Sequence, residues 1–77
     1  MTFIVGPGAL LHQVQLQARA DTWRDAELVV QMRWDVFLMA DRASRRRAFA
    51  AYVAALDVEA AAADELAHTH SDFTEAA

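Results

Sequence analysis

The sequence predicts an all-α fold in which two or three helices form a hairpin or small bundle that homodimerisation completes. The chain has 77 residues, and hydrophobic residues make up 56% of them, against about 45–50% in ordinary domains. Much of the excess is alanine, the best helix former. A single core of this size rarely supplies more than ~3–5 kcal/mol. Because the chain has no cysteine, disulfides and thiolate zinc sites cannot add to that stability, and association is the remaining common route.

Residues 1–8 are predicted to form an N-terminal arm, because Gly6-Pro7-Gly8 is the strongest helix-breaking signal in the sequence. We expect the apolar residues 3–5 to lie against an apolar surface, for example that of another subunit. The arm lacks the basic region and cleavage site of a secretion signal. No uninterrupted apolar stretch approaches the ~20 residues that span a bilayer. We therefore expect a cytoplasmic protein that does not contact the membrane.

A single helical domain is predicted over residues 9–68, and its first part fits two patterns. Helical spacing is followed by Leu10, Leu11, Val14 and Ala18. The glutamines at positions 13, 15 and 17, however, alternate with apolar residues as in a half-buried strand. Composition favours the helix, because Ala, Leu, Gln and Arg all prefer it. The strand remains the alternative.

A central helix is predicted to start or restart at Thr22, where Thr22-Trp23-Arg24-Asp25 resembles a capping box, or to kink there within one long helix. The helix is apolar on two sides. One side carries Trp23, Ala26, Val30, Trp34 and Phe37; the opposite side carries Leu28, Val29, Met32, Val36 and Met39. A surface helix of a monomer needs one apolar stripe. We therefore expect other helices, the arm or another copy to cover the second side, and we assign self-association to Leu28, Met32, Val36 and Met39.

The polar residues 41–44 predict a turn with two candidate N-caps, Asp41 and Ser44. The last helix is then expected to run from about residue 45 to residue 67. Its single apolar stripe consists of Phe49, Tyr52, Val53, Leu56, Ala60 and Ala63. Residues 69–77 carry no pattern and are predicted to be a flexible C-terminal tail.

Charge is distributed unevenly along the chain. Residues 42–47 include four arginines and no acid, whereas residues 48–77 include six acids and no Lys or Arg. Arginines at a helix N-terminus oppose the helix dipole, so they do not stabilise the helix. They are interpreted as a solvated turn balanced by acids such as Asp41, as a contact with an acidic surface of another protein or another copy, or as a phosphate contact in a helix-turn-helix. The candidate partner-binding residues are Arg42, Arg45, Arg46 and Arg47.

Few residues point to chemistry. Glu65 and His68 have the E-x-x-H spacing of di-iron bundles, and Glu27 on another helix is a conceivable further ligand. Glu65 and His68, however, lie more than about 100° around the last helix from its apolar stripe, so they point away from the core where such a metal site is built. The chain has no cysteine, two serines and no glycine-rich phosphate loop. We therefore predict no metal, no cofactor and no enzymatic activity.

The predicted function is that of a small acidic helical protein–protein interaction module, such as a regulator, an inhibitor or adaptor, or an accessory protein of a mobile element. Its expected partner is itself, as a dimer joined through the central helix, with another protein as a second partner. A nucleic-acid-binding regulator that uses residues 42–47 is the alternative, although the net charge of −4 and the lack of a second basic patch disfavour it. A metal-binding helical bundle is the third hypothesis.

Overall fold

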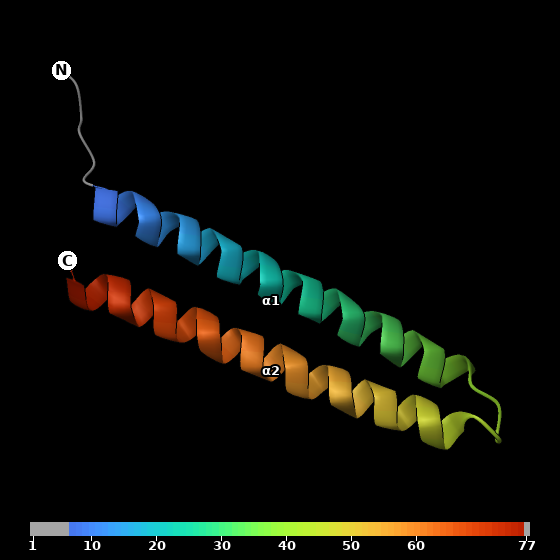
Figure 1. Cartoon of the computed structure of the whole chain (residues 1–77). Coiled ribbons are helices and arrows are strands. Elements are labelled where there is room, and N and C mark those ends of the chain that lie inside the picture. The colour runs from blue at the N-terminus through green and yellow to red at the C-terminus, as the bar shows by residue number, and fades with distance from the viewer. Residues whose placement is uncertain (1–6, 77) are drawn as a thin grey trace.

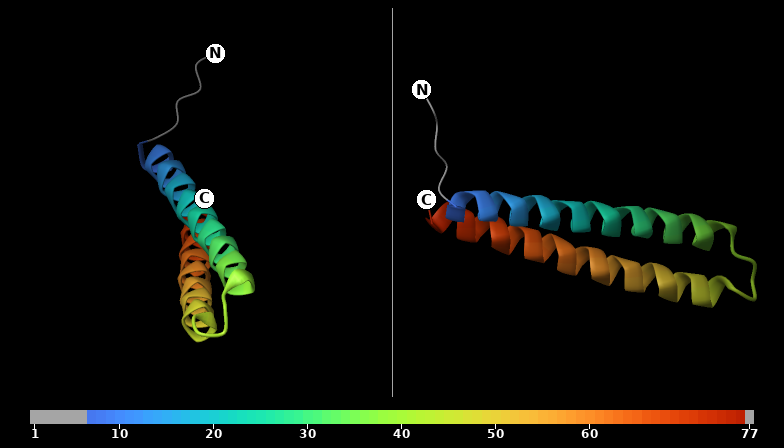
Figure 2. Two further views of the ribbon diagram at one scale, coloured as in Figure 1. Left: turned by 90° about the vertical axis from the view of Figure 1, so that its right-hand side faces the viewer. Right: turned by 45° about the horizontal axis from the view of Figure 1, so that its top comes forward.

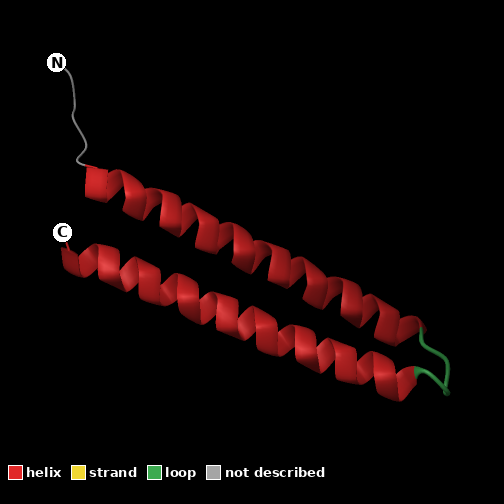
Figure 3. Ribbon diagram, viewed as in Figure 1, coloured by secondary structure: helices red, strands yellow, loops and turns green. Residues whose placement is uncertain are grey.

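The structure is a computed structural model that describes residues 7–76, and the side chains of residues 8–71. It contains two helices, α1 (Pro7–Met39) and α2 (Arg45–Ala76), which lie antiparallel as a hairpin (Figure 1). No strand occurs within the described range (Figure 3). At 1.5 Å per residue each helix is about 50 Å long. The prediction of an all-α helical hairpin is confirmed.

Helix α1 is continuous, which confirms one prediction and corrects another. Residues 9–20 are helical, as their composition favours, so the strand alternative is wrong. No helix starts or restarts at Thr22, which lies within one long helix. The Thr22 hydroxyl donates to the Ala18 carbonyl at 2.9 Å, within the helix, and does not cap a new one. Pro7 begins α1, because the first helical position needs no backbone N–H and suits the fixed φ of proline. Pro7 and Gly8 therefore belong to the helix, and the rest of the predicted arm lies outside the described residues.

The turn between the helices lies where the sequence predicts it, and both candidate caps contribute. The Asp41 carboxylate accepts hydrogen bonds from the Ser44 backbone N–H at 2.9 Å and from the Ser44 hydroxyl at 2.7 Å. The Ser44 carbonyl then accepts from the Ala48 N–H at 2.9 Å in the first turn of α2. The hydrogen bond from the Ser44 hydroxyl is the main cause that holds the pKa of Asp41 below its ordinary 3.8.

Helix α2 extends to Ala76, beyond the predicted end at residue 67. The segment predicted as a flexible tail is thus helical up to that residue. The Thr69 hydroxyl donates to the Glu65 carbonyl at 2.9 Å, and the His12 ring Nε2 lies 3.2 Å from the Thr69 carbonyl oxygen. Because α1 begins at residue 7, it provides a packing partner along this part of α2. The sequence of residues 68–76 by itself does not indicate that α1 lies alongside them, which is why the predicted helix ends too early.

The contact between the two helices is built on alanine. The buried side chains of the described region are Ala26, Ala48, Ala55 and Ala62, with 6–8% exposure. The three in α2 are spaced by seven residues, which is the repeat of an antiparallel coiled-coil seam. Larger residues of α1 lie around them, partly buried, at the same spacing: Leu16, Trp23, Val30 and Phe37. The side of α1 that carries Trp23, Ala26, Val30 and Phe37 therefore packs against α2.

The packing side of α2 coincides only in part with the predicted stripe, of which Tyr52, Leu56 and Ala63 are partly buried. Phe49 is 50% exposed, and Val53 and Ala60 are also exposed, whereas Ala48 and Ala55 are buried. The alanines face α1 because their small side chains let two long helices approach closely. The large residues of the predicted stripe lie at one edge of this contact. There the rings of Trp34, Phe37, Phe49 and Tyr52 pack with centroids 5.0–6.4 Å apart.

Polar contacts across the seam fix how the helices are aligned. The Trp23 indole N–H donates to Glu59 at 3.0 Å, and Arg19 pairs with Glu65 at 3.3 Å. The two further views in Figure 2 show the helices side by side along their length. Across the part of the chain that the structure describes, neither helix is long and apolar enough to cross a membrane.

Candidate protein-interaction surface

The second apolar side of α1 is uncovered in the hairpin. We call it the α1 outer stripe; it consists of Leu28, Val29, Met32, Val36 and Met39, which are 61%, 41%, 64%, 54% and 88% exposed. The sequence predicts that other helices, the arm or another copy cover this side. Within the described residues the second helix packs on the other side of α1. Residues 9–20, which could have formed a separate covering helix, are the first part of α1 itself. Neither this segment nor α2 therefore covers the stripe.

The same side of α1 continues towards the N-terminus, but two acids interrupt it. At 100° per residue, positions 11, 14, 18, 21, 25, 28, 32, 36 and 39 fall within an arc of about 100°. Most of their spacings alternate between three and four, as in a coiled-coil seam. Positions 21 and 25 are Asp21 and Asp25, and both are exposed. The side therefore reads apolar, acidic and apolar along its length.

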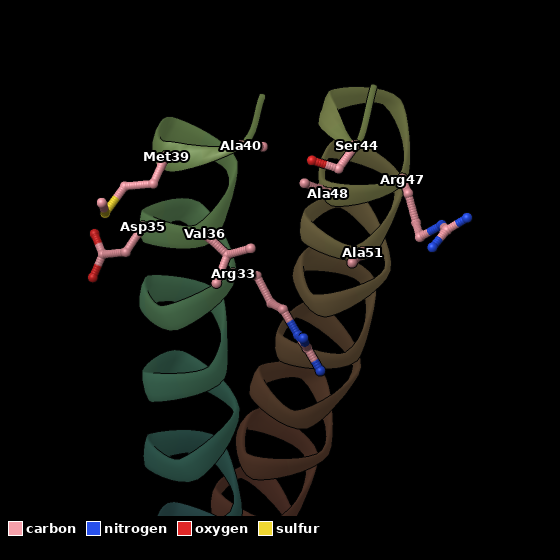
Figure 4. A pocket seen from close by; sticks show the side chains of 9 residues that line it. All are labelled: Arg33, Asp35, Val36, Met39, Ala40, Ser44, Arg47, Ala48 and Ala51. Carbon is pink, nitrogen blue, oxygen red and sulfur yellow. The ribbon is translucent and has the colours of Figure 1, made fainter. Parts of the chain in front are cut away.

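A shallow groove between the helices widens the outer stripe. Near the turn its walls are Val36, Met39 and Ala40 of α1 and Ala48 and Ala51 of α2. Figure 4 shows Val36 and Arg33 extending from α1 towards α2, while Arg47 extends outward from α2. Further from the turn the groove continues between Val29 and the side chains of Ala54 and Val58. The stripe and the groove together form one apolar surface that spans both helices.

The arginine turn, comprising Arg42, Arg45, Arg46 and Arg47, is exposed at one end of the hairpin. None of these arginines forms an ion pair with a described side chain. Asp41, the acid expected to balance them, makes its side-chain hydrogen bonds with Ser44. Four positive charges at the turn therefore have no ion-pair partner within the described hairpin.

The two acids of the α1 side differ in their contacts. Asp21 pairs with Arg24 at 3.1 Å and accepts from the Gln17 amide at 3.1 Å. Asp25 makes no hydrogen bond or ion pair within the described residues. An acid without a contact thus lies on the apolar side of α1. The same helical spacing that predicts the stripe from the sequence places Asp25 on it, although Asp25 is not among the residues predicted for this surface.

The E-x-x-H residues do not gather into a site. Glu65 pairs with Arg19 of α1, while the His68 ring Nδ1 lies 2.8 Å from the Asp64 carbonyl oxygen and 3.6 Å from its carboxylate. Glu27 lies eight residues beyond Arg19, which is about 12 Å further along α1. Among the described side chains no group of three or more His, Asp or Glu residues is placed to hold a metal.

Comparison with protein-family models, with curated proteins and with solved structures found no match for this chain. The functional proposal therefore depends on the exposed surface of the hairpin and on its charges.

Proposed function

We propose that the chain is a small protein–protein interaction module that self-associates as a homodimer through the α1 outer stripe. The exposure of that stripe is the observation that carries the proposal. In the described hairpin the buried residues are four alanines, whereas thirteen large hydrophobic residues are exposed. Contiguous exposed apolar surface of this kind marks interaction sites.

The energetics of the hairpin support the same proposal. No described side chain larger than alanine is buried, so two-helix packing leaves most of the apolar surface in water. Full burial of a Val, Leu or Met side chain contributes about 1.5–3 kcal/mol. A second copy that covers Leu28, Met32 and Met39 would provide large buried side chains that the single hairpin lacks. Small domains without disulfides or metals commonly gain stability in this way.

The arginine turn is the second part of the proposed function. Its charges without ion-pair partners fit an acidic protein surface, on another copy or on another protein, through complementary electrostatics. A regulator, inhibitor or adaptor built this way would use the stripe to assemble and the turn to select its partner. The net charge of −4 gives nucleic acid no long-range attraction to the molecule as a whole.

Absolute solution mass from light scattering on a sizing column, measured over a dilution series into the low micromolar range, tests the proposal. We expect twice the chain mass of 8.5 kDa. Met32→Glu should shift the mass to that of one chain, because it places a charge in the centre of the stripe. Gln31→Glu is the matched control, since it adds the same charge on the same helix at an exposed position about 100° away.

Circular dichroism of both variants establishes that they remain helical. A wild-type chain that is monomeric at every concentration would refute self-association. Equal loss of dimer in the two variants would show that the interface is not on the stripe.

A further inference from the structure

The acidic interruption of the α1 side restricts how two copies can pair. A parallel, in-register pair places every residue opposite itself, so Asp25 would meet Asp25 and Asp21 would meet Asp21. An antiparallel pair that overlaps the whole side, residues 11–39, has its centre at residue 25 and again brings the two Asp25 carboxylates together. Like charges juxtaposed in an interface are unfavourable. Both arrangements also place acids within the apolar contact.

A staggered antiparallel pair avoids this conflict. When its centre lies between Met32 and Val36, the apolar residues 28–39 of one copy cover the same residues of the other. Met32 then faces Val36, and Leu28 faces Met39. Residue 25 is nine residues from that centre, about 14 Å along the axis. In the other copy α1 ends at Met39, five residues or about 8 Å from the centre, so its turn, residues 40–44, lies beyond that point, in the region of residue 25.

Accepting the proposed self-association, we propose that two copies pair antiparallel about Met32 and Val36, with Asp25 of each copy in contact with the arginine turn of the other. The two-fold symmetry produces this contact twice. Asp25 and the arginines have no ion-pair partner in the described hairpin, so pairing breaks no internal ion pair. The acid opposes in-register association and favours the staggered one, as a single polar residue does in a coiled-coil seam.

Two of the four arginines face this contact. Arg47 lies at the α2 edge of the groove that Val36 and Met39 line on α1, and its side chain extends outward from α2 (Figure 4), where a second copy seated over the groove would meet it. Arg42 belongs to the turn itself. Arg46 and Arg45 leave α2 about 100° and 200° around the helix from Arg47, away from that side. The proposal therefore assigns the contact to Arg42 and Arg47, and Arg45 and Arg46 serve as its controls.

Disulfide trapping tests the orientation directly, because the chain has no cysteine of its own. Leu28→Cys and Met39→Cys are prepared as separate variants, mixed and oxidised mildly. Within one copy these positions are eleven residues apart, about 17 Å, which is too far for a disulfide. A covalent dimer with one copy of each variant is expected. Each variant linked to itself would indicate parallel pairing, and dimeric but unlinked protein would indicate another register; either result overturns the proposal.

Charge reversal tests the contact between Asp25 and the arginines. Asp25→Arg and the double variant Arg42→Asp/Arg47→Asp are each expected to raise the dimer Kd at least about tenfold. All three changes combined in one chain should restore the Kd to within about threefold of wild type. Arg45→Asp/Arg46→Asp, with the same change in net charge, should also stay within about threefold. A control as damaging as Arg42→Asp/Arg47→Asp, or no restoration in the combined variant, overturns the contact.

These experiments separate the two proposals. A wild-type chain that remains monomeric in the light-scattering series defeats self-association and the pairing together. A dimeric wild type without the crossed disulfide defeats the staggered antiparallel pairing alone.

Discussion

Single polar residues align two helices whose shared surface is otherwise small and featureless. The Trp23 indole donates to Glu59 in a partly buried position, whereas Arg19 and Glu65 are each more than half exposed. An exposed ion pair contributes little, but a less hydrated hydrogen bond to a carboxylate contributes more. Trp23 and Glu59 are therefore the residues that hold the register of α1 against α2 most strongly.

Trp23→Phe is expected to lower the free energy of unfolding by about 1–2 kcal/mol, because it removes the donor and part of the ring while leaving Glu59 at the seam. Urea unfolding followed by circular dichroism at one fixed protein concentration measures the change. Glu59→Gln keeps an acceptor oxygen and should have the smaller effect. If Trp23→Phe is indistinguishable from wild type, the hydrogen bond does not contribute to alignment.

Asp41 gives the turn a dependence on pH. The Ser44 hydroxyl and N–H hold the pKa of Asp41 below 3.8 in the folded chain. A lowered folded-state pKa means that the stabilisation is complete above the ordinary pKa and is lost as the pH falls through the folded value. We expect the melting temperature of wild type to fall relative to that of Asp41→Asn below about pH 3.8. Parallel thermal unfolding curves from neutral pH to about pH 2 test this, and a constant difference between the two proteins would contradict it.

At the level of helices, α2 shows that the largest apolar side chains need not mark the packing side. Its buried positions are Ala48, Ala55 and Ala62, and Phe49 is half exposed. A seven-residue alanine repeat lets the two helices approach closely along their length. Phe49 and Val53 lie exposed beside the seam, whereas Tyr52 and Leu56 are partly buried.

Ala55→Leu is expected to destabilise the chain by about 1–3 kcal/mol, because it overpacks the closest part of the helix contact. Ala61→Leu introduces the same side chain at an exposed position of the same helix and should change stability by less than about 0.5 kcal/mol. Chemical denaturation of both variants measures the difference. Equal stability of the two variants would show that the alanine repeat is not required for close packing.

At the scale of the molecule, residues 7–76 form a single layer of two helices with apolar residues on both its inner and outer sides. Helix α1 has one apolar side against α2 and the outer stripe opposite. If a second copy covers that stripe, stability becomes a property of the dimer, and folding depends on concentration by mass action.

The thermal midpoint of wild type is therefore expected to rise with protein concentration. Each tenfold increase should add about 1.4 kcal/mol to the apparent free energy of unfolding per dimer. Midpoints recorded by circular dichroism over a hundredfold range of concentration provide the measurement, and Met32→Glu should show no such rise. A wild-type midpoint that is the same throughout that range would indicate a hairpin that folds alone.

The sequence by itself determined the helical fold, the turn and the two-sided character of α1. These features depend on local properties: alanine content, the Asp41 and Ser44 caps, and the helical spacing that separates Trp23 and Phe37 from Met32 and Val36. They can be read from neighbouring positions because capping and helical periodicity act over a few residues. The candidate surface residues of α1 follow from the same periodicity.

Only the tertiary structure decided how far α2 extends and which side of α2 packs. Helix α2 continues past residue 67 alongside α1, where His12 meets Thr69, and Ala55 is buried because the opposing helix comes close. Both outcomes depend on α1, the helix that α2 packs against. The extent of α2 and its packing side are set by the surface that the helix meets, and the local sequence pattern does not contain that surface.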